Sequence, residues 1–286
     1  MRIDAHQHYW KIARGDYGWI TPGIGKLYRD FLPEHLAPHL RDHRLDGTIV
    51  VQAAPTLAET EFLLSLADAT ESIAGVVGWL DLFDPDHGAH FRRLSAHPKL
   101  VGFRVMIQEM PDARDILQPE FVGALRRYAA EDVPVDLLVV SHQLEPLIEL
   151  LGQVPGLRGV IDHIGKPRIA DKRMEPWAEQ LAAIARHPNI YCKLSGMVTE
   201  ADRDRWQPDD LVPYIRHALD RFGPRRVLFG SDWPVCLLAA DYDRVVDALE
   251  RAVPDDWTAE DRRRLFGWNA VEFYKLSFGG HESNGV

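Results

Sequence analysis

The chain has little cysteine and no long apolar run. Only two cysteines occur, Cys192 and Cys236, and both lie in apolar, strand-like segments. We therefore expect two buried thiols in a reducing compartment rather than a disulfide framework. No apolar run reaches the roughly 18 residues of a membrane span, and no charged-then-apolar leader precedes the first predicted strand. The sequence thus predicts a soluble, cytoplasmic protein.

Positive charge is also scarce. The formal net charge is −10, which disfavours nucleic acid and anionic membranes as partners, because both bind clustered Lys and Arg. The one basic run, 262–264, is expected to be a solvated helix face. We expect a small-molecule partner instead, and the sequence leaves open whether the chain is a monomer or a homo-oligomer.

Short apolar runs are abundant, and they alternate with longer amphipathic stretches. Near-continuous apolar runs are typical of strands that are buried on both faces. Eight such runs occur, at 3–8, 48–53, 73–82, 101–107, 135–140, 159–164, 190–195 and 227–232. Apolar residues at helical spacing predict helices between most of them, at 59–70, 120–130, 143–151, 175–186, 209–221 and 242–253. Thr258, with Asp261 three residues later, resembles a capping box before a last helix.

Eight strands that alternate with helices predict a (β/α)8 barrel, for which about 250 residues are typical. A doubly wound sheet is the rival, but no glycine-rich dinucleotide turn follows the first strand. We expect a single domain over residues 1–276 and a frayed tail over 277–286, which is rich in Gly, Ser and Asn. In such a barrel the chemistry lies at the C-terminal ends of the strands.

The first and last predicted strands both end in polar residues. His6 and His8 point to the same face, because side chains on a strand alternate with period two. Two imidazoles on one face can hold one metal ion or one polarised oxygen; the alternative is a pair of partly exposed histidines in a solubilising turn. Asp232 closes the last apolar strand, where an acid has little structural reason to be, and Trp233-Pro234 then turns the chain. Asp4, deeper on the first strand, is expected to be a buried hydrogen-bond acceptor, with a part in the chemistry as the alternative.

Further polar residues follow other predicted strands, namely Gln52, Trp79, Arg104, His163, Lys193 and Ser195. Because Asp162 and His163 are adjacent, a regular strand would send only one of them into the barrel. We expect this to be His163, with Asp162 capping backbone or pairing outside. A buried Lys is costly unless it is paired, so Lys193 is either a structural ion-pair partner or a substrate-binding cation. Gln52 and Trp79 could pack or bind.

An aromatic insert, residues 9–33, directly follows His8. It is rich in Trp, Tyr, Gly and Pro and would lie over the mouth of the barrel. We interpret it as part of a substrate pocket, with a plain connecting loop as the alternative.

Several motifs together resemble the amidohydrolase superfamily. They are Asp4-Ala5-His6-Gln7-His8, Asp162-His163-Ile164-Gly165-Lys166-Pro167, Cys192-Lys193-Leu194-Ser195-Gly196 and Gly230-Ser231-Asp232-Trp233-Pro234. They look most like the amidohydrolase 2 branch, which contains sugar lactonases of the L-fuconolactonase and L-rhamnonolactonase type. The resemblance covers residue 2 to about residue 274.

The resemblance implies a (β/α)8 barrel in which an activated water attacks a carbonyl. His6, His8, His163 and Asp232 would form the catalytic constellation, with Asp232 as general base. Binuclear members have a carboxylated lysine at the end of the fourth strand, where this chain has Arg104, which disfavours two metals. Two alternatives stay open: one Zn²⁺ or other divalent metal, held by the same four residues, or no metal.

The sequence favours a lactonase that opens a neutral sugar (aldono-) lactone. Asp232 would take the proton of the attacking water and return it to the ring oxygen, and the three histidines would stabilise the oxyanion. The expected substrate-binding residues are Arg104, Lys193, Gln52, Trp79 and Ser195. One alternative is a metal-dependent nonoxidative decarboxylase of the same branch. The other is a non-catalytic barrel that binds a sugar acid or a metal.

Overall fold

Eight parallel strands form the centre of the computed structural model, which describes residues 1–277. Each strand pairs with the next one along the chain. The strands are β1 (Ile3–Gln7), β2 (Gly47–Val51), β3 (Ile73–Trp79), β4 (Leu100–Met106), β5 (Val135–Leu138), β6 (Gly159–Ile161), β7 (Ile190–Leu194) and β8 (Val227–Phe229). All eight predicted strands are therefore confirmed, and the single-domain (β/α)8 barrel with them.

The ring closes where the two ends of the strand series meet. Residues just after β8 bind β1 and the residue that follows it: the Asp232 N–H donates to the His6 carbonyl at 2.8 Å, and the His8 N–H donates to the Trp233 carbonyl at 2.7 Å. These bonds place the carboxyl ends of β1 and β8 side by side.

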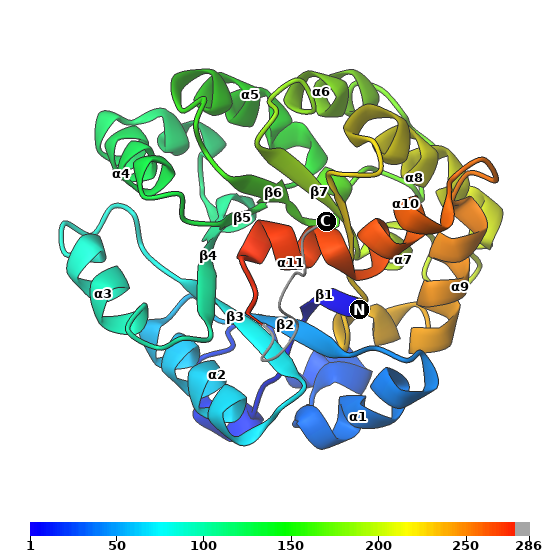
Figure 1. The fold of residues 1–286 in the computed structure, drawn as a ribbon, viewed down its shortest axis with the longest axis horizontal. Helices are drawn as coiled ribbons and strands as arrows, with labels where there is room; N and C mark the ends of the chain where they lie inside the picture. Colours follow the sequence, from blue (N-terminus) through cyan, green and yellow to red (C-terminus); the bar gives the residue numbers. More distant parts are fainter. Residues whose placement is uncertain (278–286) are drawn as a thin grey trace, which may run out of the picture.

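Helices surround the ring (Figure 1). They are α1 (Pro33–Asp42), α2 (Leu57–Ala69), α3 (His87–Leu94), α4 (Pro119–Ala130), α5 (Leu144–Gln153), α6 (Trp177–Ile184), α7 (Met197–Glu200), α8 (Pro208–Phe222), α9 (Tyr242–Ala252), α10 (Ala259–Arg263) and α11 (Asn269–Tyr274). The six helices predicted from periodicity are present. Helices α1 and α3 were not predicted, because each carries few apolar residues on its inner face: α1 buries only Leu36 and Leu40, and α3 only Gly88 and Leu94.

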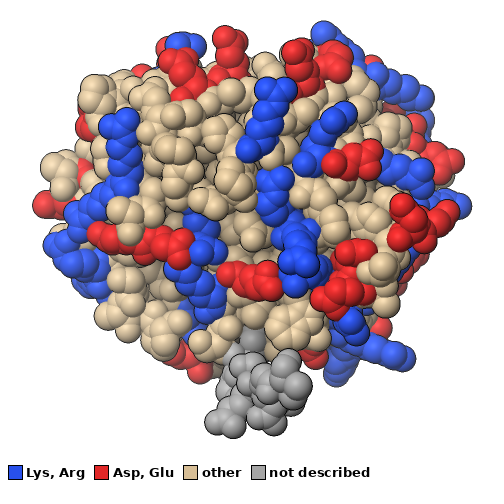
Figure 2. Space-filling model, turned by 45° about the horizontal axis from the view of Figure 1, so that its top comes forward, with Lys and Arg blue, Asp and Glu red and all other residues tan. Residues whose placement is uncertain are grey.

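The expected capping box begins α10. The Asp261 N–H donates to Thr258 Oγ1 at 3.1 Å, and the Thr258 N–H donates to Asp261 Oδ2 at 2.9 Å. The basic run at the end of this helix is paired locally, since Arg263 and Arg264 both contact Glu260. Figure 2 shows charges of both signs interspersed over one face of the molecule.

The short helix α11 covers the amino-terminal end of the barrel, where it lies across the ring in Figure 1. Asn269 Nδ2 donates to the Val227 carbonyl at 2.7 Å, and the Tyr274 hydroxyl donates to Asp136 Oδ1 at 2.7 Å inside the barrel. The amino-terminal end of the barrel is therefore closed by packed side chains, and a binding site has room only at the opposite end.

Both cysteines are buried and unpaired, as expected. Among residues 1–277, no helix has both the length and the apolar character that a membrane crossing requires. The predicted frayed tail, 277–286, lies almost entirely outside the described residues.

Candidate active site

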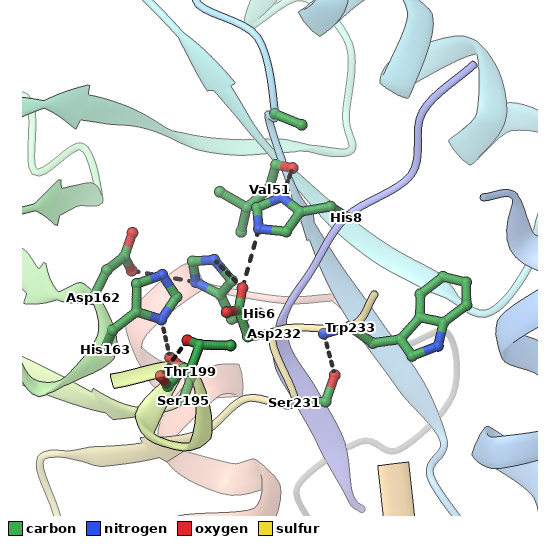
Figure 3. A network of polar contacts seen from close by, with 12 residues as sticks. His6, His8, Val51, Asp162, His163, Ser195, Thr199, Ser231, Asp232 and Trp233 are labelled. Atoms are coloured by element: carbon green, nitrogen blue, oxygen red, sulfur yellow. Dashed lines mark hydrogen bonds and ion pairs between the residues drawn. The ribbon is translucent and has the colours of Figure 1, made fainter. Parts of the chain in front are cut away.

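Four side chains converge at the carboxyl ends of β1, β6 and β8 (Figure 3). His8 Nε2 lies 3.3 Å from Asp232 Oδ1, and His6 Nε2 lies 3.9 Å from the same oxygen. The His6 ring centroid is 4.6 Å from that of His163 and 5.0 Å from that of His8. Each of the four is at most 4% exposed. The structure thus brings together the four residues that were expected from the sequence to be catalytic.

The backbone beyond β8 turns Asp232 toward the histidines. Asp232 has a φ of +56°, in the left-handed region that few residues adopt. The preceding Ser231 is fixed by Asp4, whose carboxylate accepts from the Ser231 N–H at 2.9 Å and its hydroxyl at 2.5 Å. Tyr242 donates to the same carboxylate at 2.9 Å. Asp4 is therefore the buried acceptor that was expected, and it supports the turn that carries Asp232.

Hydrogen bonds to the histidine rings determine which nitrogen faces the site. His8 Nδ1 lies 2.8 Å from the Val51 carbonyl. A carbonyl can only accept, so Nδ1 donates to it and Nε2 faces Asp232. His163 Nδ1 lies 2.9 Å from Ser195 Oγ, which orients that ring in turn. Such outer contacts fix ring orientation in metal and catalytic sites.

Asp162 corrects one expectation, because it lies inside the barrel rather than outside it. It is fully buried, with Oδ1 3.3 Å from His6 Nδ1 and 3.1 Å from Lys193 Nζ. Adjacent residues face opposite sides only on a regular strand, but β6 ends at Ile161 and His163 has a φ of +54°. A chain that has left the strand conformation no longer alternates, so Asp162 and His163 both point inward.

Of the two roles expected for Lys193, its position favours the structural ion pair over substrate binding, because it does not line the cavity. Its side chain is fully buried, and it pairs with both Asp136 and Asp162. Burial acts to raise the pKa of Asp162, but Lys193 and His6 outweigh it and hold that pKa well below its usual range. Sequence analysis missed Asp136, although an acid within the apolar run 135–140 was a visible signal.

The cavity above these residues has a volume of about 270 Å³, near the lower end of ligand sites, which span roughly 300–1,000 Å³. His8, His163 and Asp232 form its floor, and Arg104 lines it as expected. The expected ligand-binding roles of three other residues find no support in their positions. Gln52 and Ser195 are fully buried beneath the cavity, and Trp79 lines a neighbouring hollow.

The walls contain residues that sequence analysis did not nominate, namely Gln108, Glu109, Lys166, Thr199, Glu200 and Arg203. All follow β4, β6 or β7, so the rule that loops after barrel strands carry function could have found the segments. It could not have shown which side chains turn inward. The insert contributes Trp19 and Ile24, which supports its interpretation as part of the pocket.

Burial and charge together set the protonation of the floor. Burial lowers the pKa of His163 well below its ordinary value, although Asp232 acts to raise it. Burial acts to raise the pKa of Asp232, but His163 and His8 lower it, and the net shift is downward. At neutral pH the floor therefore combines a neutral His163 imidazole with an ionised carboxylate.

The floor also fits one divalent metal ion. Among the described residues, His6 Nε2 is buried without a hydrogen-bond partner, and His8 Nε2 faces a carboxylate oxygen. An imidazole nitrogen and a carboxylate oxygen in such contact need a proton or a cation between them. His6, His8 and Asp232 place one ligand atom each within 4.8 Å of one another, and imidazole and carboxylate are suitable ligands for zinc.

Comparison with known proteins agrees with this geometry. The family model for amidohydrolases matches residues 3–276. An L-fucono-1,5-lactonase from Burkholderia ambifaria is 40% identical over 281 residues, which cover 96% of each chain. The crystal structure of an amidohydrolase from Burkholderia multivorans with bound zinc is 39% identical, with a TM-score of 0.90 over 97% of this chain and all of that one.

A 2,6-dihydroxybenzoate decarboxylase is a far more distant structural neighbour. It is 15% identical, with a TM-score of 0.65 over 96% of this chain and 98% of that one, and this likeness shows the fold alone. The strand-end constellation, the barrel and the match over nearly the whole length all agree. The chain belongs to the amidohydrolase family.

Proposed function

We propose that this protein hydrolyses a sugar lactone, with Asp232 as the base that activates the attacking water. One observation carries the proposal: an ionised carboxylate and two imidazoles form the floor of a small cavity, and the buried His6 ring lies directly beside them. The lactonase name of a relative that is 40% identical over nearly the whole chain supports the same reaction.

In the proposed reaction, Asp232 takes a proton as the water oxygen bonds to the lactone carbonyl carbon. The bond between that carbon and the ring oxygen then breaks, and Asp232 returns the proton to the ring oxygen, so that a hydroxy acid is formed. In this mechanism Ser195 Oγ, 2.9 Å from Nδ1 of His163, donates to that nitrogen, so that the ring carries its proton on Nε2 and donates it to the oxyanion. Arg104 supplies positive charge beside the same cavity.

A metal ion would be held by His6, His8 and Asp232, with His163 beside them. When bound, it supplies Lewis-acid polarisation of the carbonyl. The donor set supports one Zn²⁺ or another divalent metal, because Nε2 of His6 and Nε2 of His8 both face the same carboxylate oxygen.

The charge of the cavity favours a neutral lactone over a dicarboxylate. Six charged residues line it, and their signs balance: Arg104, Lys166 and Arg203 against Glu109, Glu200 and Asp232. A dianion would require a clear excess of cations. The balance supports an uncharged, hydroxylated ring as the substrate.

A panel of aldonolactones, followed with a pH indicator, tests the proposal. We expect the wild-type protein to release acid from at least one of them and Asp232→Asn to lose that activity while keeping its fold by circular dichroism. Full activity of the variant would remove Asp232 from the mechanism. Binding without turnover across the panel would instead support a non-catalytic barrel.

The same panel after exhaustive chelation tests the metal. If a metal supplies the polarisation, activity falls on chelation and returns with Zn²⁺ or another divalent metal. Undiminished activity would leave the reaction to the side chains alone and would argue against a metal-dependent decarboxylase.

A further inference from the structure

The walls of the cavity carry polar groups that the hydrolysis does not use. Gln108 follows β4, whereas Lys166 follows β6 and Glu200 ends α7 just after β7. Because β4 and β7 are three places apart in a ring of eight strands, these groups line the cavity from opposite sides. A ligand held over the floor would therefore lie between them.

These wall groups have unused hydrogen-bonding capacity. Gln108 Oε1 is buried and has no partner among the described residues. Lys166 Nζ lies 4.0 Å from Glu200 Oε1, which is beyond hydrogen-bond distance. An oxygen atom about 2.8 Å from both atoms fits between them, and a hydroxyl there can accept from the ammonium and donate to the carboxylate.

A purely structural ion pair is the competing explanation. Both side chains keep contact with solvent at the cavity, with exposures of 21% for Lys166 and 27% for Glu200, and exposed pairs of this kind contribute little to stability. Burial also raises the pKa of Glu200, although Lys166 acts to lower it, as expected for a carboxylate turned into a partly enclosed space. Lys166 and Glu200 are too far apart for a direct hydrogen bond and are partly exposed to the cavity. This arrangement favours ligand binding over a purely structural ion pair.

We propose that Lys166 and Glu200 together bind one ring hydroxyl of the substrate and that Gln108 accepts from a hydroxyl on the opposite side. The inference rests on the proposed lactone hydrolysis and deepens it. The floor acts on the lactone group that all such substrates share, and the walls select the rings that carry hydroxyls at the right positions.

The test compares two substrates of the same ring size: a hydroxylated aldonolactone and the lactone that lacks the hydroxyls. Glu200→Gln keeps an acceptor oxygen but removes its charge, and we expect it to lower kcat/KM for the hydroxylated ring by about 10-fold, because a hydrogen bond to a charged group is roughly twice as strong as a neutral one. Its kcat/KM for the unsubstituted ring should stay within about twofold, since no contact is lost there. Gln108→Leu should show the same selective loss.

Asp204→Asn is a matched control, because Asp204 lies four residues further along and lines a neighbouring depression rather than the cavity. It should leave both substrates unchanged. Circular dichroism verifies the fold of each variant. An equal loss on both rings, or no loss on the hydroxylated one, overturns the inference while the proposed hydrolysis stands. If the wild-type protein opens neither lactone, the proposed function itself fails and this inference fails with it.

Discussion

The floor and the walls of the cavity are built in different ways. The floor residues stand at strand ends, are at most 4% exposed, and rest on a buried cluster in which Lys193 pairs with Asp136 and Asp162. The wall groups stand on the segments that follow the strands. Lys166 and Glu200 keep about a fifth to a quarter of their side chains exposed, and Gln108 Oε1 has no partner among the described residues. The difference suggests that the reacting geometry is fixed by the barrel, whereas recognition is assigned to segments that can vary without disturbing it.

The insert, residues 9–33, differs from both the floor and the other wall segments, because hydrogen bonds to the barrel hold its part of the wall in place. Tyr17 donates to Glu59 Oε2 at 2.6 Å, and the Ala53 N–H donates to Oε1 of the same carboxylate at 3.2 Å. Trp19, which lines the cavity, donates from Nε1 to the Ala53 carbonyl at 2.8 Å. Glu59, at the start of α2, thus anchors the insert on the barrel rim beside the position of Trp19.

The largest effect on activity should come from the floor. Asp232→Asn removes the base, and we expect kcat to fall by about 10³- to 10⁴-fold, toward the upper range for general acid–base catalysis. Unlike Glu200→Gln, it should lower kcat by the same factor for hydroxylated and unsubstituted lactones. Steady-state kinetics on both substrates measures this. Unequal losses would show that the division between floor and wall is not real.

The largest effect on stability should come from beneath the floor. Lys193→Met leaves Asp136 and Asp162 without their cation, and breaking a buried pair in this way costs about 3–5 kcal/mol. Urea unfolding gives the free energy of unfolding. Lys166→Met is the matched control, because its partly exposed pair should contribute less than about 1 kcal/mol. Similar values for the two variants would contradict the assignment of Lys193 to structure.

The anchor of the insert should depend on pH. Burial raises the pKa of Glu59 to about 7, against the lowering effect of its bonds from Tyr17 and Ala53. The folded state therefore holds a proton that the unfolded state has lost between about pH 4.5 and 7, and stability falls as the pH rises through that window. A shift of this size corresponds to about 3 kcal/mol.

Glu59→Gln removes that titration. The variant should gain stability relative to the wild type as the pH rises from 5 to 7.5, which urea unfolding at each pH measures. A constant difference across the range would show that Glu59 titrates normally and that the anchor does not depend on its protonation.

The smallest effect should come from the apolar wall. Trp19→Ala removes an aromatic face from the cavity, and we expect KM to rise by about 3- to 10-fold with kcat nearly unchanged, as for a contact made equally in the ground and transition states. Tyr28→Ala, which removes an exposed aromatic ring outside the cavity, is the control. A fall in kcat with constant KM would assign Trp19 to the floor instead.

Much of the fold could be predicted because parallel strands buried on both faces leave continuous apolar runs. The positions of His6, His8 and Asp232 followed from the rule that barrel strands present function at their carboxyl ends. The inward direction of both Asp162 and His163 could not be predicted, since it depends on the positive φ of His163, and a single sequence gives no signal for that turn.

The interior role of Lys193 was equally hard to predict. Its partner Asp136 is 57 residues away along the chain, and only the closed ring brings the two together. Gln108 and Glu200 lie in short helical turns that follow β4 and β7, and such turns are too short to show a periodicity in the sequence. The sequence therefore predicts the strands and the floor well, and the walls poorly.

The seam that closes the barrel has a consequence for folding. The peptide groups of His6, His8 and Asp232 themselves form its hydrogen bonds. The site is therefore assembled only when the first strand meets the segment that follows the last strand. Contacts between residues so far apart in sequence form slowly. Enzymatic activity should therefore return later during refolding than the helical circular dichroism signal. The time course of its return would measure the rate at which the seam between β1 and β8 forms.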